Sequence, residues 1–586
     1  MNKTIIITLT SITTLSVGVL FPVNAFDIRN IDGTDNNISN PSYGSAGSDL
    51  IRLSEFDYED GFSEPRGGDP SVLPSPRAIS NAVSAQTFSI PNAKGVSDWV
   101  WQWGQFLDHD LSLSPSGTES FNIPVPQGDE FFDPFNTGTA EISLNRSESN
   151  TDGSGVRQQF NEITAYIDAS NIYASESTRT NFLRSNDGTG KLRATTADNG
   201  EKLLIKNTDN LENETGGSPN SEDFFVSGDV RANEQVGLLT AHTLFMREHN
   251  RLADELKTRL DNGETALVNK RDAAIADTNN NVNDEGDFIF EAARKVVGAQ
   301  MQVITYEEWL PIVLGKNPLV NYSGYNDTVN AGIANEFSTA AFRFGHTMLS
   351  PNLNRVDNNN NIVASLSLQE SFFDPDEVKQ NGVDTILKGL AFQKAQEVDT
   401  FLVDDVRNFL FGAPGAGGFD LASLNLQRGR DHGIPDINTV RRALGLSGYS
   451  TFLELTGGDE DLANALASIY SDIDEVDLWI AGLAEQKVNG GLLGETFSSI
   501  LIDQFSRSRD GDRFFYLNEL AHLNILDPTL ETLTLSEIIR RNSTIDNIQD
   551  NAFLVSSVPE ADNKLGLLTF FLLSVIGSHL RSKNRK

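Results

Sequence analysis

Apolar side chains recur at helical spacing through most of the chain after residue 95. The clearest example is NEQVGLLTAHTLFMREHNRLADELKTRL (233–260), where Leu238, Leu239, Phe245 and Leu252 share one face and charged residues lie opposite. The same spacing predicts helices over residues 96–111, 286–315, 334–349, 433–446 and 490–520. Strand-like runs are few and short, and no internal repeat is visible. The pattern therefore predicts a mainly α fold, with one large helical domain whose core covers residues 96–555.

Two kinds of segment lack this periodicity. Residues 26–95 are rich in Gly, Pro, Asn and Ser, and we interpret them as an extended, turn-rich arm of the same domain with little periodic structure. The loops DTNNNVNDEGD (277–287) and VDNNNNIV (356–363) look like calcium loops, but Val282 and Ile362 stand where an EF-hand requires glycine. We expect both loops to be solvated surface insertions.

Composition narrows the functional classes. The 586 residues carry a formal net charge of −37, which disfavours nucleic acid and anionic membrane surfaces as partners because both are negatively charged. The chain has no cysteine, which excludes disulfides, zinc–thiolate sites, iron–sulfur clusters and cysteine nucleophiles. An exported form would be held together by its core, by metals or by cofactors.

The amino terminus has the features of a secretory signal peptide. Residues 1–25 combine the basic Lys3, an apolar stretch rich in Ser and Thr, and the small-residue sequence VNA, which predicts cleavage after Ala25. A buried first helix is the alternative interpretation. The Ser and Thr content argues against a membrane-spanning helix.

The carboxyl terminus, residues 556–586, has the order of parts of a sorting signal. Pro559 and Glu560 precede an apolar run from residue 565 to 576, and a basic end follows. This order resembles the PEP-CTERM tails of Gram-negative bacteria, although Ala561 replaces the second proline of that motif. A terminal amphipathic core helix is the alternative interpretation.

One candidate for chemistry is the segment WGQFLDHD. On a helix, Gln105, Asp108 and His109 fall at positions i, i+3 and i+4, so they share one face. Taken alone, His109 is better explained as a core histidine whose hydrogen bonds are satisfied.

Two further segments favour a functional role for His109 over a purely structural one. GDVRANEQ places Arg231 and Glu234 three residues apart, which by itself indicates a local ion pair. FRFGHTML places His346 on an apolar helical face, where a neutral imidazole suits iron but also suits simple core packing.

Together with these segments, other blocks of the chain are similar to the signature blocks of one family. They are GDVRANEQVGLLTAHTLFMREHNRLADEL, ARKVVGAQMQVITYEEWLPIVLG, SLNLQRGRDHGIP and SRDGDRFF, preceded in the arm by IRNIDGTDNN and PRAISNAV. The chain resembles the animal-type haem peroxidases of the peroxidase–cyclooxygenase superfamily in the order of all these blocks. The resemblance covers nearly everything between the two terminal signals, and RANEQ is similar to peroxidasin-like members.

The resemblance implies roles on the peroxide side of a haem b. His109 would be the base that takes a proton from hydrogen peroxide and returns it to the leaving oxygen. Arg231 would stabilise the negative charge that develops as the O–O bond breaks. Gln105 would hold water there and line the halide position.

On the opposite side, the resemblance implies that His346 is the ligand of the haem iron. Asn425 would accept the other N–H of that imidazole and so fix its tautomer. Arg343 and Arg428 would pair with the haem propionates.

Two carboxylates match positions that form ester bonds to haem in vertebrate relatives. These are Asp108 and Glu234, and free carboxylates at the haem edge are the alternative. A third link of one vertebrate member requires methionine after that glutamate, and Gln235 stands there instead.

A calcium ion is implied by ITAYIDASNIY together with Asp110. Alternating residues of an extended loop face one side, and oxygen atoms of Thr164, Tyr166, Asp168 and Ser170 would complete a cage with the Asp110 carboxylate. A polar turn is the alternative. An ion beside this helix would hold His109 in place.

These implications give one functional prediction: a secreted, calcium-supported peroxidase that reduces hydrogen peroxide and oxidises halides, pseudohalides or phenolic donors. We expect it outside the cell or in the envelope of a Gram-negative-type bacterium, with envelope or matrix association through its tail. A fatty-acid dioxygenase is disfavoured because Arg343 and Phe344 occupy the segment where such enzymes carry a radical-forming tyrosine. A non-catalytic matrix protein is disfavoured because it would not need the whole set of site residues.

Overall fold

The computed structural model describes residues 26–67 and 72–556. The expected signal peptide, and all of the expected sorting tail after Ser556, lie outside the described residues. The α-helices are α1 (Pro76–Val83), α2 (Trp99–Leu111), α3 (Ser170–Tyr173), α4 (Ser177–Leu183), α5 (Val236–Asp261), α6 (Thr265–Ala276), α7 (Glu285–Val303), α8 (Leu310–Val313), α9 (Asn335–Thr339), α10 (Pro375–Asn381), α11 (Asp384–Phe392), α12 (Asp404–Arg407), α13 (Leu421–Asp431), α14 (Ile437–Ala443), α15 (Phe452–Leu455), α16 (Glu460–Ala467), α17 (Leu478–Ala484), α18 (Glu495–Asp510), α19 (Tyr516–Leu526) and α20 (Leu535–Asn542).

Short irregular helices and strands join them. The former are η1 (Ser221–Asp223), η2 (Ile304–Trp309), η3 (Ala341–Met348), η4 (Gln369–Ser371), η5 (Ile473–Glu475) and η6 (Leu530–Thr532). The strands are β1 (Ser48–Asp49), β2 (Ser116–Ser120), β3 (Ile123–Pro124), β4 (Glu141–Ile142), β5 (Asn145–Ser147), β6 (Asn150–Thr151), β7 (Arg157–Gln158), β8 (Phe160–Asn161), β9 (Ala194–Thr196), β10 (Lys202–Lys206), β11 (Phe225–Val226), β12 (Asn352–Val356) and β13 (Ile362–Ser367). They pair as antiparallel ribbons, with β9, β10 and β11 in one three-stranded sheet. The prediction of a mainly α fold with few short strands is confirmed.

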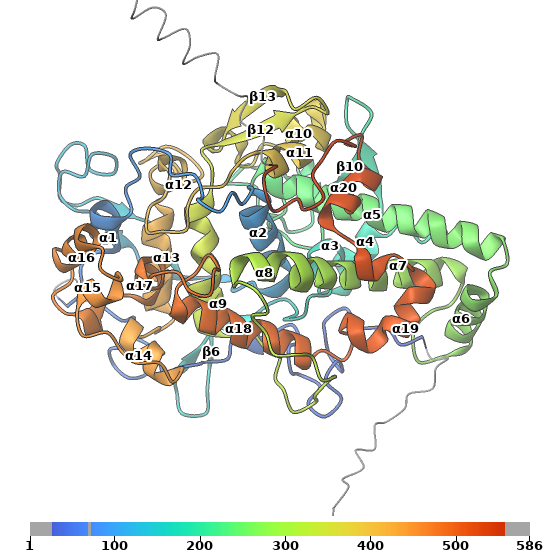
Figure 1. Cartoon of the computed structure of the whole chain (residues 1–586), viewed down its shortest axis with the longest axis horizontal. Helices are drawn as coiled ribbons and strands as arrows, with labels where there is room; N and C mark the ends of the chain where they lie inside the picture. Colours follow the sequence, from blue (N-terminus) through green and yellow to red (C-terminus); the bar gives the residue numbers. More distant parts are fainter. Residues whose placement is uncertain (1–25, 68–71, 557–586) are drawn as a thin grey trace, which may run out of the picture.

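The core is organised around α2, α5 and α7. In Figure 1, α5 and α7 run side by side toward one end of the molecule, where α6 joins them, and α2 lies near the centre. The amphipathic face predicted for α5 is buried, including Leu238, Leu239 and Phe245. Helix α2, with His109, packs against both α5 and η3, and η3 carries His346. Arg231 lies in the segment before α5 and lines the same cavity.

Two sequence expectations need correction. The arm over residues 26–95 contains a regular helix, α1, because Ser75 caps its first turn and Pro76 is pre-set for the first helical position. The segment around His346 is not one α-helix: α9 ends at Thr339, and η3 continues as a 3-10 helix. A 3-10 helix is wound more tightly than an α-helix, so its side chains are displaced from α-helical positions. The residues that share a face with His346 therefore cannot be deduced from a period of 3.6 residues.

The arm lies across the helical core rather than apart from it. Arg29 and Asn36 both bind the carboxylate of Asp512, which follows α18. At the other end of the fold, Val96 pairs with Leu554, so the start of the core and the end of the described chain are tied together. The Asn-rich loop over residues 357–361 is the exposed turn between β12 and β13, in agreement with a surface insertion.

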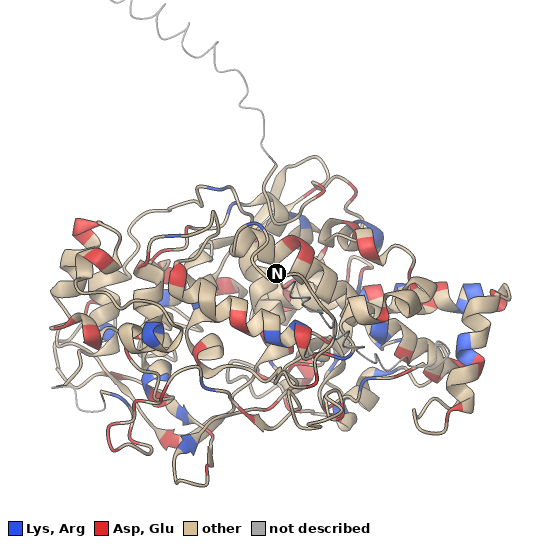
Figure 2. Cartoon of the chain, turned by 60° about the horizontal axis from the view of Figure 1, so that its bottom comes forward, with Lys and Arg blue, Asp and Glu red and all other residues tan. Residues whose placement is uncertain are grey.

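Charge is distributed over the surface elements. Figure 2 shows basic positions scattered among acidic ones along helices and loops, and the sequence holds 45 Lys and Arg against 82 Asp and Glu. Among the described residues, no helix has both the length and the apolar character that crossing a bilayer requires.

Candidate active site

A cavity of about 400 Å³ opens between α2, the segment before α5, η3 and α13. This volume is typical of a small-molecule or cofactor site. Most of the residues predicted to surround a haem line it: Gln105, Asp108, His109, Arg231, Glu234, Arg343, His346 and Arg428. The structure therefore brings together side chains that are separated by more than 300 positions in the sequence.

Helix α2 positions the first wall of the cavity. Gln105 and Asp108 face it, and His109 lies in the last helical turn, with 3% of its surface exposed. Burial and the nearby Arg231 hold the pKa of His109 well below its ordinary value, so the imidazole is neutral. A neutral imidazole is the form that can accept a proton from a bound substrate.

A residue that the sequence argument missed, Asp229, organises this wall. Its carboxylate accepts two hydrogen bonds from the Arg231 guanidinium, at 2.9 and 2.7 Å, and lies 3.4 Å from Nδ1 of His109. Burial alone would raise the pKa of Asp229, but Arg231 reverses that effect and the carboxyl group stays ionised. The segment SGDVRANEQ contained a signal for the contact between Asp229 and Arg231. An acidic residue two positions before a functional arginine can hydrogen-bond its guanidinium and fix the orientation of that side chain.

Two glutamines set the position of Gln105. Gln235 donates to the Gln105 side-chain oxygen at 3.0 Å and to the Gln102 oxygen at 2.6 Å. Gln235 therefore has a structural role, because it positions Gln105. From the sequence, Gln235 stood out only because one vertebrate relative has methionine at its position. Its role could not be read from the sequence, because Gln102 and Gln235 lie 133 residues apart.

The two carboxylates proposed for haem esters lie at the cavity edge in unlike environments. Asp108 is 3.5 Å from Arg231 and accepts a hydrogen bond from Ser112 at 2.9 Å, yet burial still raises its pKa. Burial, reinforced by the nearby Glu214, raises the pKa of Glu234 to about 8. Glu214 lines the same cavity and is a further carboxylate that the sequence argument did not select.

The opposite wall carries His346, whose Nδ1 lies 2.8 Å from the amide nitrogen of Asn425. Burial, with a contribution from Arg343, lowers the pKa of His346 to about 3, so this ring is also neutral. The pairing with Asn425 agrees with the prediction, but its sense is reversed: the amide donates to Nδ1. The reason is that Arg343, which can only donate, binds the Asn425 oxygen at 3.1 Å.

Both predicted propionate partners already donate hydrogen bonds within the protein. Arg343 donates to Asn425 and to the backbone oxygen of Ser338, and burial lowers its pKa to about 10. Arg428 binds Ser147 and Asp431, each at 2.9 Å. Both side chains line the cavity, so an anionic group bound there would compete with these protein partners.

Behind the end of α2, the predicted calcium residues form one buried cluster. Asp110 accepts hydrogen bonds from the Ser170 hydroxyl at 2.9 Å and from the Asp168 N–H at 3.0 Å. Thr164 donates to Asp168 at 3.1 Å, and Tyr166 is buried in the same loop. Burial and the adjacent Asp168 raise the pKa of Asp110 to about 8. Among the described residues, no group of three or more His, Asp or Glu is arranged to hold a metal ion.

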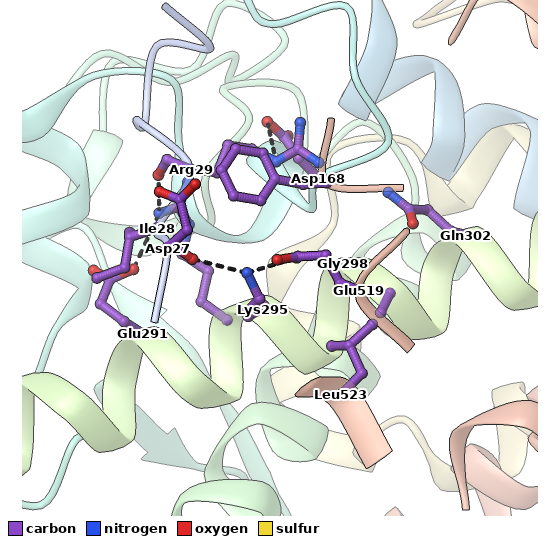
Figure 3. Close-up of a pocket in the computed structure, with 13 residues that line it drawn as sticks. Asp27, Ile28, Arg29, Asp168, Glu291, Lys295, Gly298, Gln302, Glu519 and Leu523 are labelled. Atoms are coloured by element: carbon purple, nitrogen blue, oxygen red, sulfur yellow. Dashed lines mark hydrogen bonds and ion pairs between the residues drawn. The ribbon is translucent and has the colours of Figure 1, made fainter. Parts of the chain in front are cut away.

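The amino-terminal arm closes the outer side of this cluster. Figure 3 shows Arg29 beside Asp168, with Lys295 between the Asp27 backbone and Glu519. Arg29 binds Asp512 at 2.9 Å and lies 3.9 Å from Asp168. A pocket of about 30 Å³ lies between the arm and α7, with room for little more than one water molecule.

The remaining described histidines fit structural roles. His249 contacts the Tyr173 hydroxyl and the Gly190 carbonyl, and His242 contacts Ser227 at 3.0 Å. His432 also lines the cavity, where it contacts Asn335 and Ser147. His522 pairs with Lys270 far from the cavity.

Comparisons with known proteins place this site in a family. The family model described as animal haem peroxidase matches residues 28–553. Peroxinectin A of Dictyostelium discoideum is 35% identical over 90% of this chain and 96% of its own. Peroxidasin of Drosophila melanogaster is 35% identical over 84% of this chain, which spans only 34% of that relative's length.

Solved structures agree. Peroxidase A from Dictyostelium discoideum superposes with a TM-score of 0.81 at 33% identity, covering 90% of this chain and 100% of that one. A fatty acid alpha-dioxygenase of Oryza sativa has a TM-score of 0.72 at 21% identity, over 91% of this chain and 87% of that one, and shares the fold alone. The chain belongs to the animal haem peroxidase family and is a haem-dependent peroxidase that acts on hydrogen peroxide.

Proposed function

We propose that haem b binds in the 400 Å³ cavity between His109 and His346, and that the protein is a secreted peroxidase that uses peroxide to oxidise halides, pseudohalides or phenols. The observation that carries the proposal is that two neutral histidines from α2 and η3 line one cavity together with Arg231. A haem bound there supplies the iron at which peroxide is reduced.

On the α2 side, His109 takes the first proton of bound hydrogen peroxide and later returns it to the leaving oxygen. Asp229 serves this step in two ways. It holds the Arg231 guanidinium through two hydrogen bonds, and it lies close enough to His109 to stabilise the imidazolium that proton uptake creates.

On the η3 side, His346 would hold the haem iron through Nε2, which would require Nδ1 to carry the proton. The Asn425 amide then has to turn, so that its oxygen accepts from Nδ1. Because Arg343 binds that oxygen, the turn is coupled to release of Arg343. A haem propionate is the group that would draw Arg343 away, with Arg428 as the second propionate partner.

Two further features are part of the proposal. Asp108 and Glu234 would hold the edge of the haem and could form ester bonds to it, each bond requiring the two-electron oxidation of a haem methyl group by one molecule of hydrogen peroxide. One calcium ion binds Asp110, Thr164, Tyr166, Asp168 and Ser170, and neutralises the two buried carboxylates.

The proposed location rests on the sequence. The basic, apolar and small-residue parts of residues 1–25 support export, and the Pro-Glu, apolar and basic parts of residues 556–586 support sorting to the envelope of a Gram-negative-type bacterium. Mass spectrometry of the protein recovered from its native cell fraction tests both: the mature chain is expected to begin at Phe26 and to lack the tail.

The central experiment is purification with haem, followed by the Soret spectrum and peroxide-dependent oxidation of bromide, iodide and a phenol. His346→Ala is expected to lose the haem spectrum and turnover, and a variant that keeps both contradicts the ligand assignment. Acid–acetone extraction tests the esters, because haem that moves into the organic phase is not covalently bound.

The dioxygenase alternative has one observation in its favour, the shared fold of the Oryza sativa enzyme. The described residues of η3 place Arg343 and Phe344 beside the cavity, and no tyrosine lies within that element. Oxygen uptake with linoleate, without peroxidase turnover, would support the alternative.

A further inference from the structure

Helix α2 carries three tryptophans in alternate positions, Trp99, Trp101 and Trp103, and their indole N–H groups have different partners. Trp99 donates to the Leu387 carbonyl at 3.0 Å, and Trp103 donates to the Thr305 hydroxyl at 3.2 Å. Trp101 donates to a carboxylate, Oδ1 of Asp98, at 2.9 Å. The other two tryptophans of the chain, Trp309 and Trp479, donate to backbone carbonyls, so only Trp101 among all five is paired with an acid.

Trp101 is also the one of the three that reaches the cavity. It lines the cavity with Gln105 and His109, which follow it by four and eight positions on the same helical face. Its Cβ lies beside Gly345, the residue before His346. Trp101 therefore touches both walls of the proposed haem site while only 3% of its surface is exposed.

The side chain of Asp98 binds the Trp101 indole instead of capping its own helix. It stands at the N-cap of α2, where a carboxylate ordinarily accepts from the N–H groups of the first turn, yet it makes no such bond there. Its Oδ1 accepts instead from the Trp101 indole and from the Ser350 hydroxyl at 2.8 Å. Only 1% of Asp98 is exposed, and burial raises its pKa to about 7, so it can take up and return a proton near neutral pH.

We propose that Trp101 is a redox-active residue that gives one electron to the oxidised site after peroxide has been reduced, while Asp98 takes the indole proton. The inference rests on the proposed function, because reduction of hydrogen peroxide to water leaves two oxidising equivalents at the site. One of them removes an electron from the indole, the N–H bond breaks, and the proton moves to Oδ1 of Asp98.

The cycle closes after two molecules of a phenolic donor have reacted in turn, because peroxide reduction leaves two oxidising equivalents and each phenol supplies one electron. The first phenol gives its electron to the indolyl radical, and the second reduces the equivalent that remains at the site. The protons that the two phenols release balance the two that reduction of peroxide to water consumes. Asp98 returns the stored proton to Nε1, and both side chains regain their starting states. Loss of an electron makes an indole N–H far more acidic, so a carboxylate in contact lowers the cost of oxidation, whereas a carbonyl or hydroxyl partner does not. This difference singles out Trp101 from its two neighbours on the helix.

The test treats the haem-loaded protein with hydrogen peroxide without any donor. Freeze-quenched samples are examined by electron paramagnetic resonance, and digested samples by mass spectrometry. We expect a tryptophan radical and, once dissolved dioxygen has trapped it, a gain of one or two oxygen atoms at Trp101. Trp99 and Trp103 provide internal controls in the same molecule. Oxygen gain spread equally over the three would overturn the proposal.

Two variants separate the role of the indole from that of the carboxylate. Trp101→Phe is expected to lose at least 90% of the radical signal while still consuming peroxide. Asp98→Asn keeps an oxygen for the indole to bind but cannot take the proton, so the radical should shift to a protonated spectrum with a yield at least threefold lower. Trp103→Phe should leave signal and yield unchanged.

The outcomes distinguish this inference from the proposed function. If the wild-type protein binds haem and consumes peroxide but forms no radical and gains no oxygen at Trp101, the inference is wrong and the proposed function stands. If the haem-loaded wild-type protein consumes no peroxide, the proposed function fails, and the inference fails with it. Trp101→Phe with an unchanged radical signal also overturns the inference.

Discussion

The end of α2 separates two polar clusters that look alike in the sequence and differ in the structure. Asp108 and His109 face a cavity of about 400 Å³, whereas the next residue, Asp110, faces a closed loop. Both oxygens of Asp110 accept hydrogen bonds from residues 168–171. By contrast, Nδ1 of His109 has no hydrogen-bond partner among the described residues, although it lies 3.4 Å from Asp229.

This difference in hydrogen bonding indicates that the two clusters have different roles. A buried polar group without a full set of partners is costly, and such groups persist where a ligand or a reaction requires them. A buried carboxylate bound by several N–H and O–H groups is held in one geometry and can hold its surroundings in turn. We infer that the cavity side carries out the chemistry and that the loop side keeps the end of α2 in place.

The largest effect is expected from His109→Leu. Loss of the proton acceptor should slow peroxide consumption by about 10²–10⁴-fold, the usual contribution of general acid–base catalysis. Haem content and the melting temperature should change little, because a leucine fits a position that opens on a cavity. Stopped-flow measurement of peroxide consumption checks this.

His249→Leu is the matched control, because His249 is equally buried but bonds Tyr173 and Gly190 away from the cavity. Its loss should lower the melting temperature and leave the rate constant within a factor of a few. A His109→Leu enzyme with less than a tenfold loss contradicts the assignment of the base.

Asp229→Asn should have the next largest effect, now on stability. The Asp229 side chain is 1% exposed and binds the Arg231 guanidinium at two points, so removing its charge leaves Arg231 with only the longer contact to Asp108, at 3.5 Å. Breaking such a pair costs about 3–5 kcal/mol of unfolding free energy. Urea denaturation measures it, and peroxide consumption should slow as well because Arg231 loses its fixed direction.

The control for Asp229→Asn is Glu264→Gln. This residue forms a similar two-point contact with Arg259 on the surface, where the Glu264 side chain is 39% exposed. An exposed pair contributes about 0–1 kcal/mol. Equal losses in the two variants would show that burial of the Asp229–Arg231 pair has no special role.

Asp229 also marks the limit of what the sequence predicts. The amphipathic pattern of α5 predicted the helical fold, and the family resemblance of the spaced motifs implied most of the predicted residues that line the cavity, but not Glu214. Gln235 was missed because its role consists of contacts with residues of another segment, Gln102 and Gln105. For Asp229 the sequence held the local contact with Arg231 but not the approach to His109 on α2. The direction of the Asn425 amide was missed for the same reason, since Arg343 decides it.

Calcium removal should have a smaller effect, confined to stability. If the loop binds calcium, an excess of about a hundred times the dissociation constant adds about 2.7 kcal/mol, and chelation removes it. The melting temperature should fall with a chelator and recover with calcium but not with magnesium, which demands a tighter octahedral shell.

Asp110→Asn should have the lower melting temperature from the start and gain little from calcium. Asp133→Asn is the matched control, because that carboxylate also accepts several hydrogen bonds but only within its own turn. An Asp110→Asn protein that gains as much from calcium as the wild type contradicts the loop as the binding site.

The pH dependence of Glu234 separates the cavity from the loop once more. Burial, with the nearby Glu214, raises the pKa of Glu234 from 4.5 to about 8 in the folded protein. Between these values the folded state holds a proton that the unfolded state has lost, so folding takes up a proton. The contribution of Glu234 to the stability of the haem-free protein should therefore be largest below about pH 4.5 and fall as the pH rises to about 8. Urea denaturation at a series of pH values measures this slope. Calcium is kept saturating, so that the contribution of the loop stays constant.

Glu234→Gln should flatten the slope, and so should an ester bond to haem, because neither an amide nor an ester titrates. A wild-type slope that survives in Glu234→Gln would mean that other groups of the cavity carry the proton.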